Sequence, residues 1–303
     1  MQKNMGGEII MELTITNLSK KFQDMVAVNQ VSYTMTTGVY GLLGVNGAGK
    51  TTLMRMLCTL LNPTSGFIRL DGKDIFTMRE DYRKILGYLP QDFGFYPDFS
   101  VYDYLMYISS IKGLCPIVAK QRTEQLVEKV GLSKVGKKKM KKLSGGMKRR
   151  AGIAQAMLND PKILILDEPT TGLDPNERIR FRNLISELAE ERLVLLSTHI
   201  VSDIEYIANE ILLMQDGQIR ESGTLEDLIS AMPVQVWSAI VTKDKAEFFL
   251  KSYKVSNVKT VQNGIELRIL SKEQPTENAI LASATLEDLF LYYFGERTGE
   301  EDV

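Results

Sequence analysis

Short apolar runs alternate with amphipathic stretches over much of this chain, and the alternation predicts its main fold. The runs at 39–43, 163–166 and 193–196 are continuously apolar, which is typical of strands buried on both faces. Between them, apolar residues recur at helical spacing. A chain that alternates strand and helix in this way builds a mainly parallel sheet, so the pattern predicts an α/β core.

Two segments depart from this alternation. Residues 11–36 contain short β-rich runs and predict strands, whereas strand signals vanish at about 92–160. In the second segment apolar residues such as Leu126, Val127 and Val130 recur at helical spacing, so we expect a helical insertion there.

The C-terminal part has its own pattern. Residues 234–242 and 264–270 alternate like half-exposed strands, and 245–253 has the spacing of a helix. The segment Thr285–Asp288 predicts a cap for a last apolar helix from Leu289 to Phe294.

This change of pattern predicts two domains, 11–231 and 232–303. The second is a small α+β accessory domain whose core is marginal at this size, so we expect it to lean on the main domain or on a copy of itself. Residues 1–10 precede the first strand signal at Met11 and are expected to be a dispensable leader or a misassigned start.

The composition argues against several classes of protein. Lys and Arg number 37 against 38 Asp and Glu, a net charge of −1, so no global basic field exists to hold DNA or an anionic membrane. Cys58 and Cys115 give no disulfide framework, which fits a reducing cytosol. No apolar run approaches the roughly 18–20 residues of a membrane span. If the protein serves transport, we expect the membrane path on another chain.

The segment Gly44–Thr51 matches the phosphate-loop pattern GxxxxGK(S/T). It follows a predicted strand and opens a helix expected from about Gly49 to Leu60, a context that argues against a chance glycine-rich turn. The loop N–H groups and the helix N-terminus favour the phosphates of a nucleoside triphosphate. We expect Lys50 to reach the β- and γ-phosphates and Thr51 to offer its hydroxyl to Mg²⁺. The expected nucleotide contacts are Asn46, Gly47, Ala48, Gly49, Lys50, Thr51 and Thr52.

Two carboxylates, Asp167 and Glu168, end the apolar run at 163–166. A buried parallel strand delivers the residues at its C-terminal end to the ligand crevice. We therefore expect Asp167 to hold Mg²⁺, directly or through water, and Glu168 to polarise the attacking water.

The motif Leu143-Ser144-Gly145-Gly146-Met147, together with these two segments, resembles the signature of the ATP-binding cassette (ABC) family. The resemblance covers about residues 11–230. It implies a P-loop ABC ATPase core, with a mainly parallel sheet, an antiparallel β subdomain and a helical insertion. It also implies binding of ATP and Mg²⁺ and hydrolysis of ATP. In that family the signature of one subunit completes the ATP site of another, so a dimer is implied.

The remaining motifs of the family follow in order, and the resemblance assigns them roles. Gln91, in Leu89-Pro90-Gln91, is expected to sense Mg²⁺ and to link to the transmembrane partner. His199, the only histidine, follows a predicted buried strand and is expected to contact the γ-phosphate. Phe22 falls where the family stacks an aromatic ring on adenine. Lys50, Gln91, Glu168 and His199 thus form the expected catalytic group.

A second group is expected to act across the dimer. Ser144, Gly145 and Gly146 would donate to the γ-phosphate bound by the opposite subunit. Asp174, in Gly172-Leu173-Asp174, would lie at the dimer seam. The departures from the commoner family pattern, Met147 for glutamine, Phe22 for tyrosine and Gly172 for alanine, remove no phosphate-contacting residue.

The segments LSGGMKRR, TTGLD and TLEDLFLYYFG resemble subunits of bacterial drug, antibiotic or peptide exporters whose membrane subunit is encoded separately. This resemblance implies a transmembrane permease as partner and a second nucleotide-binding subunit, identical or different. It also implies a cytoplasmic location on the inner face of the membrane.

Three alternatives stay open. A non-transport ABC ATPase in translation or DNA maintenance would normally carry two cassettes or a long coiled coil, and neither pattern is present. Residues 234–303 could form a ligand-sensing domain, although no binding motif appears there. The basic run Lys137–Lys142 with Lys148–Arg150 could bind nucleic acid, but no aromatic residues interleave it, and we interpret it as a solvated face.

Overall fold

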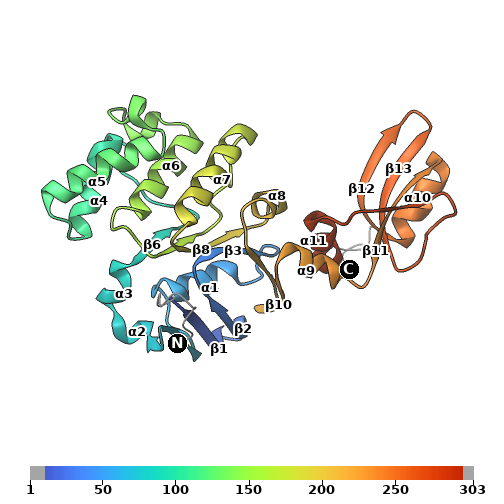
Figure 1. Ribbon diagram of the computed structural model, residues 1–303, viewed down its shortest axis with the longest axis horizontal. Coiled ribbons are helices and arrows are strands. Elements are labelled where there is room, and N and C mark those ends of the chain that lie inside the picture. The colour runs from blue at the N-terminus through green and yellow to red at the C-terminus, as the bar shows by residue number, and fades with distance from the viewer. Residues whose placement is uncertain (1–10, 296–303) are drawn as a thin grey trace, which may run out of the picture. The chain divides into compact units, whose positions relative to one another are not determined.

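The computed structural model describes residues 11–295, and its central sheet has six strands (Figure 1). Their order is β10 (Gln218–Gly223), β9 (Glu210–Gln215), β3 (Gly38–Leu43), β8 (Leu193–Thr198), β7 (Ile163–Leu166) and β6 (Leu86–Leu89). The pairs β9–β3, β3–β8, β8–β7 and β7–β6 are parallel. The predicted parallel core is confirmed, and the C-terminal ends of these strands lie at one edge of the sheet.

A second, antiparallel sheet contains the N-terminal strands. Its order is β2 (Met25–Met35), β1 (Leu13–Phe22), β4 (Ser65–Leu70) and β5 (Lys73–Asp74). Buried residues of both sheets, such as Leu13, Ile68 and Leu42, share one hydrophobic core with α1 (Lys50–Leu57).

Helix α1 begins where the phosphate loop predicts but ends earlier than expected. Its C-cap is Cys58, and Thr59 turns the backbone into the left-handed region at φ 55°. This change of backbone direction at Thr59 ends the helix before the Asn62-Pro63 stop, so the residues up to Leu60 belong to a turn.

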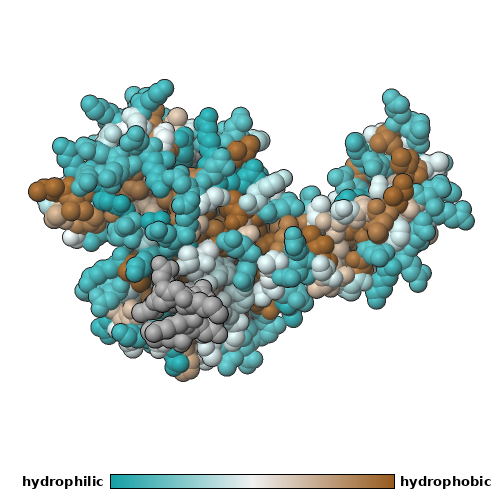
Figure 2. All heavy atoms as spheres, in the orientation of Figure 1, coloured by the Kyte–Doolittle hydropathy of each residue, from teal (hydrophilic) through white to brown (hydrophobic). Residues whose placement is uncertain are grey.

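The expected helical insertion lies between β6 and β7. It contains α4 (Val101–Ile111), α5 (Pro116–Lys129), two short 3₁₀ turns (Ser133–Val135 and Met140–Lys142) and α6 (Gly145–Ala156). Some apolar side chains are exposed on its surface (Figure 2), and Ile111 at the end of α4 and Ile117 at the start of α5 are among the exposed apolar residues. Outside the insertion, α2 (Ile75–Met78) and α3 (Glu80–Lys84) precede β6, and α7 (Pro175–Ala189) and α8 (Val201–Glu205) follow β7.

The chain divides into two compact units between Arg220 and Glu221. The second unit begins before α9 (Leu225–Ser230), which contacts α11 (Leu286–Phe294), whereas the sequence pattern put the boundary after this helix. Residues 1–10 lie outside the described residues.

The second unit contains a four-stranded sheet with the order β12 (Lys254–Val261), β13 (Gly264–Ser271), β11 (Gln235–Val241) and β14 (Ile280–Ala282). Its core lies between this sheet and α10 (Lys243–Ser252). Thr285 and Asp288 form the capping box at the start of α11, as the sequence predicts. Within residues 11–295, no helix combines the length and the apolar character needed to cross a membrane.

Candidate functional site

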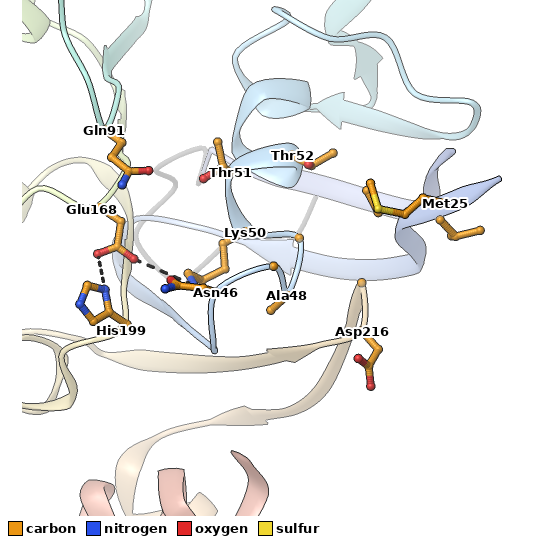
Figure 3. Close-up of a pocket in the computed structure, with 15 residues that line it drawn as sticks. Met25, Asn46, Ala48, Lys50, Thr51, Thr52, Gln91, Glu168, His199 and Asp216 are labelled. Atoms are coloured by element: carbon orange, nitrogen blue, oxygen red, sulfur yellow. Dashed lines mark hydrogen bonds and ion pairs between the residues drawn. The ribbon is translucent and has the colours of Figure 1, made fainter. Parts of the chain in front are cut away.

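A cavity of about 610 Å³ opens at the C-terminal edge of the central sheet, beside the phosphate loop (Figure 3). Gln91, Glu168 and His199 lie along one wall, and Met25 lies on the opposite side. The lining residues are Met25, Val26, Ala27, Asn46, Gly47, Ala48, Gly49, Lys50, Thr51, Thr52, Gln91, Glu168, His199, Asp216 and Gly217. The fold thus brings together residues from six separate parts of the sequence.

The phosphate loop delivers the N-terminus of α1 to this cavity. Gly49 has φ 105°, and a Cβ at this position would lie 2.3 Å from the Ala27 carbonyl oxygen, so only glycine fits. Within the described residues, no side chain caps α1 at Gly49. The first N–H groups and the positive end of the helix dipole therefore stay available for an anion.

Lys50 is buried within the loop. Its Nζ donates to the carbonyl oxygens of Gly44 at 2.7 Å and Val45 at 3.1 Å, and lies 4.0 Å from Glu168 Oε1. Burial lowers the pKa of Lys50, while the charges of Glu168 and Asp167 oppose this shift. Lys50 also lines the cavity, so its ammonium can donate to an anion that enters it.

Asp167 lies behind the phosphate loop at the end of β7. Its Oδ1 accepts from Ser197 Oγ at 2.7 Å and from Thr51 Oγ1 at 3.3 Å. Its Oδ2 is buried and has no hydrogen-bond partner among the described residues. A buried carboxylate oxygen without a partner can accept a hydrogen bond or bind a cation.

Glu168 has its carboxylate held from two sides. Oε2 accepts from Thr171 Oγ1 at 3.1 Å and lies 2.9 Å from His199 Nδ1. The residue has φ 47°, a left-handed conformation that is rare for a non-glycine residue and common at functional sites. The other carboxylate oxygen, Oε1, faces Lys50 and the cavity.

The residues expected to act across a dimer do not line this cavity. Ser144 is exposed and caps α6 by accepting from the Met147 N–H at 3.2 Å. Asp174 is also exposed and caps α7 by accepting from the Glu177 N–H at 2.9 Å. A Cβ on Gly145 would lie 3.8 Å from the Gly172 carbonyl oxygen. The two exposed caps, Ser144 and Asp174, therefore belong to one surface of the chain. Gly146 is the next residue of α6 after Gly145.

Phe22 also lies outside the lining residues. Its ring is 40% exposed at the end of β1, with Lys20 Nζ 5.1 Å from the ring centroid. The start of β2, just after the turn that follows Phe22, contributes Met25, Val26 and Ala27 to the cavity instead.

Two features of the site were not predicted from the sequence. Thr171 contacts the Glu168 carboxylate, and nothing in its local pattern separates it from an ordinary loop threonine. The interpretation of Lys148–Arg150 as a solvated face is wrong for its arginines: Arg149 is 8% exposed, and the Arg150 side chain is 12% exposed beside Glu177. The lysines between 137 and 142 are exposed, as expected.

Comparison with known proteins gives consistent matches. The family model described as ABC transporter matches residues 28–171. The Nod factor export ATP-binding protein I of Burkholderia lata is 33% identical over 290 residues, covering 92% of this chain and 95% of that protein. The bacitracin transport ATP-binding protein BcrA of Enterococcus faecalis is 38% identical over 229 residues, covering 73% and 72%. The structure of cbiO1 from Clostridium perfringens, part of the ABC transporter complex cbiONQ, matches with a TM-score of 0.65 and 27% identity, covering 72% of this chain and 90% of that chain.

Proposed function

The chain belongs to the ABC transporter ATP-binding proteins, and we propose that it hydrolyses ATP to power a separately encoded membrane subunit that exports a drug, an antibiotic or a peptide. The observation that carries the ATPase site is the convergence of Lys50, Glu168 and His199 on the cavity at the phosphate loop. The similarity to export and bacitracin-transport proteins supports the exporter branch.

The phosphates of ATP would bind the uncapped N-terminus of α1. Lys50 would give up its hydrogen bonds to the loop carbonyls and donate to the β- and γ-phosphates instead. The phosphates are charged and therefore stronger acceptors for the desolvated ammonium. The loop contacts would run from Asn46 to Thr52, and adenine would stack near Phe22 and the turn that follows it.

Glu168 is proposed as the group that orients the attacking water. Thr171 and His199 hold its Oε2, so Oε1 faces the cavity and can accept a hydrogen bond from water. His199 and Lys50 would steady the charge on the transferred phosphoryl group.

Mg²⁺ fits the oxygen atoms beside the loop. Asp167 Oδ2 is buried and unpartnered among the described residues, and the Thr51 hydroxyl already contacts the same carboxylate. Thr51, Asp167 and Gln91 would hold the ion, which would neutralise charge on the β- and γ-phosphates when bound.

The second half of each ATP site would come from another subunit. Ser144, Gly145 and Gly146 are remote from their own cavity but start a helix whose N-terminus can meet a γ-phosphate. Asp174 would lie at the same seam. The partner subunit can be a second copy of this chain or a related chain.

The same proposal sets the remaining partners and the location. A transmembrane permease would contact the segment around Gln91, and the protein would lie on the inner face of the cell membrane through that permease. The alignment with the Nod factor export protein spans 290 residues, more than the first unit contains. This supports an accessory role in the transporter for the C-terminal domain, which the sequence pattern predicts at 232–303, after the core of 11–231. A non-transport ATPase is not favoured.

Substituting Glu168→Gln tests the ATPase site. The amide keeps the shape of the side chain but cannot accept a proton, so turnover should fall by roughly 10²–10⁴-fold while ATP still binds. ATPase rate and nucleotide affinity are measured on the same preparation, with wild type as reference. A variant that hydrolyses ATP at the normal rate would remove Glu168 from this role.

A further inference from the structure

Arg149 is a buried arginine that bonds to backbone carbonyls at the edge of the ATP site. It lies on α6 and is 8% exposed. Its guanidinium donates to the carbonyl oxygens of Gln91 at 2.6 Å, Pro90 at 3.3 Å and Glu168 at 2.7 Å. Burial lowers the pKa of Arg149, and the nearby negative charges of Asp92, Asp167 and Glu168 oppose that shift. A buried cation with this set of acceptors is held for a specific geometry.

The carbonyls that Arg149 holds belong to the segments that directly follow two neighbouring strands. Pro90 and Gln91 follow β6, and Glu168 follows β7, which pairs with β6 in parallel. One NH group of the guanidinium reaches the first pair, and the other NH group reaches Glu168. The rigid fork therefore sets the spacing between two segments that both line the cavity.

The bond to Glu168 acts on a strained residue. Glu168 has φ 47°, its N–H donates to Ser197 Oγ at 2.9 Å, and its C=O accepts from Arg149. The peptide groups on both sides of the residue are thus held. Because the left-handed backbone aims the carboxylate, this pair of bonds helps to keep Glu168 directed at the cavity.

We propose that Arg149 is a positioning residue for ATP hydrolysis, which ties the orientation of α6 to the backbone at Gln91 and Glu168 of its own ATP site. The inference rests on the ATPase function proposed above. Helix α6 starts at Ser144, the residue expected to meet the nucleotide of the opposite subunit. A shift of α6 on engaging that nucleotide would therefore move the water-orienting and Mg²⁺-sensing segments of its own site.

Arginine is required for this task by its shape. Lysine keeps the charge but offers one nitrogen, which cannot span carbonyls on two strands. Glutamine removes the charge and shortens the reach. Arg192 provides a matched control, because it also donates to backbone carbonyls, those of Pro161 at 2.9 Å and Leu188 at 2.8 Å, and neither of these acceptors lines the cavity.

The test compares R149Q, R149K and R192Q in the full chain. R149Q should lower kcat by about ten-fold or more while the KM for ATP changes by less than about three-fold, because the phosphate-loop contacts are intact. R149K should recover only a small part of the loss, and R192Q should keep the wild-type kcat. An equal loss of kcat in R149Q and R192Q, or full recovery in R149K, would overturn the positioning role.

A second measurement is independent of activity. Amide hydrogen exchange on the nucleotide-free protein should rise in R149Q at peptides containing Gln91 and Glu168 and stay unchanged in R192Q. Unchanged exchange at both peptides, or a uniform rise across the whole helical insertion, would refute the proposal. If wild type neither bound nor hydrolysed ATP, the proposed function would fail, while the exchange result would still decide whether Arg149 fixes these two segments.

Discussion

At the scale of single residues, the Glu168 carboxylate depends on its neighbours for its direction. Oε2 accepts a bond from Thr171 Oγ1 at 3.1 Å and lies 2.9 Å from His199 Nδ1. His199 is also expected to contact the γ-phosphate, so replacing it would affect both the Glu168 carboxylate and the phosphate. Thr171 is not among the residues that line the cavity. Replacing it therefore tests how much the direction of the Glu168 carboxylate matters for hydrolysis.

Replacing Thr171 by valine removes the hydroxyl and keeps the shape of the side chain. A hydrogen bond to a charged group is worth about 1.5 kcal/mol or more, which corresponds to a fall in kcat of about ten-fold. The KM for ATP should change little, because Thr171 is not among the lining residues. Steady-state ATPase assays on T171V and T171S decide the point: serine keeps the hydroxyl and should restore most of the rate. Equal rates in the two variants would leave the hydroxyl without a role.

The sequence predicted one class of site residue and missed another. Lys50, Thr51 and the Asp167-Glu168 pair lie in local patterns whose spacing carries their chemistry, so they could be found without a structure. Arg149 could not, because its acceptors are 58 and 19 positions away and a run of basic residues most often faces solvent. Burial of a charge is decided by tertiary packing.

At the scale of elements, strands with a continuous apolar run were predicted best. Strand β7 coincides with its predicted run at 163–166, because a buried strand needs apolar residues at every position. Strands β12 and β14 were missed, since they are the two edges of their sheet and β12 is largely polar and contains no buried residue. Edge strands gain their structure from pairing with β13 and β11, which no local pattern reveals.

The start of α11 contains a buried ion pair that joins this helix to the sheet of the second unit. Asp288 is 1% exposed and accepts from Arg268, Ser256 and Thr285. Burial by itself would raise the pKa of Asp288, but the hydrogen bonds from Arg268, Ser256 and Thr285 outweigh it and lower the pKa below its ordinary value. The pair therefore stabilises the unit only while the carboxylate is ionised.

Replacing Asp288 by asparagine should destabilise the second unit by about 3 kcal/mol at neutral pH, because it leaves Arg268 half-buried without its anion. The single tryptophan, Trp237, lies on β11 and packs against the core of this unit, so its fluorescence reports the unfolding in urea. E247Q, which breaks the exposed Glu247–Lys251 pair on α10, is the control and should leave the midpoint unchanged.

The same variant has a distinct pH dependence. Since the folded pKa of Asp288 is lowered, its contribution is complete above the ordinary carboxyl pKa and is lost as the pH falls through the lower folded value. Wild type should lose stability over this acid range, and D288N should lose less. Parallel curves for the two proteins would assign the acid sensitivity to other groups.

At the scale of the whole molecule, the proposed ATP site would be only half built by one chain. Every residue that lines the cavity lies in the first unit, and Ser144 lies on an exposed surface away from it. A symmetric dimer can bring the signature of each chain to the cavity of the other, so two lesions in different halves should complement one another. In this proposal Lys50 would act on the nucleotide of its own chain, and Ser144 on that of the partner subunit.

Mixing K50A chains with S144R chains tests this division. Each variant alone forms dimers with two defective sites, whereas random mixing gives roughly half heterodimers, each with one intact site and one carrying both lesions. ATPase activity of the mixture should therefore exceed that of either variant alone. The control mixes K50A with E168Q: both lesions act on the nucleotide of their own chain, so every dimer stays defective and no activity should return. Recovery in both mixtures, or in neither while ATP-closed dimers form normally, would show that Ser144 does not serve the site across the interface as a separable half.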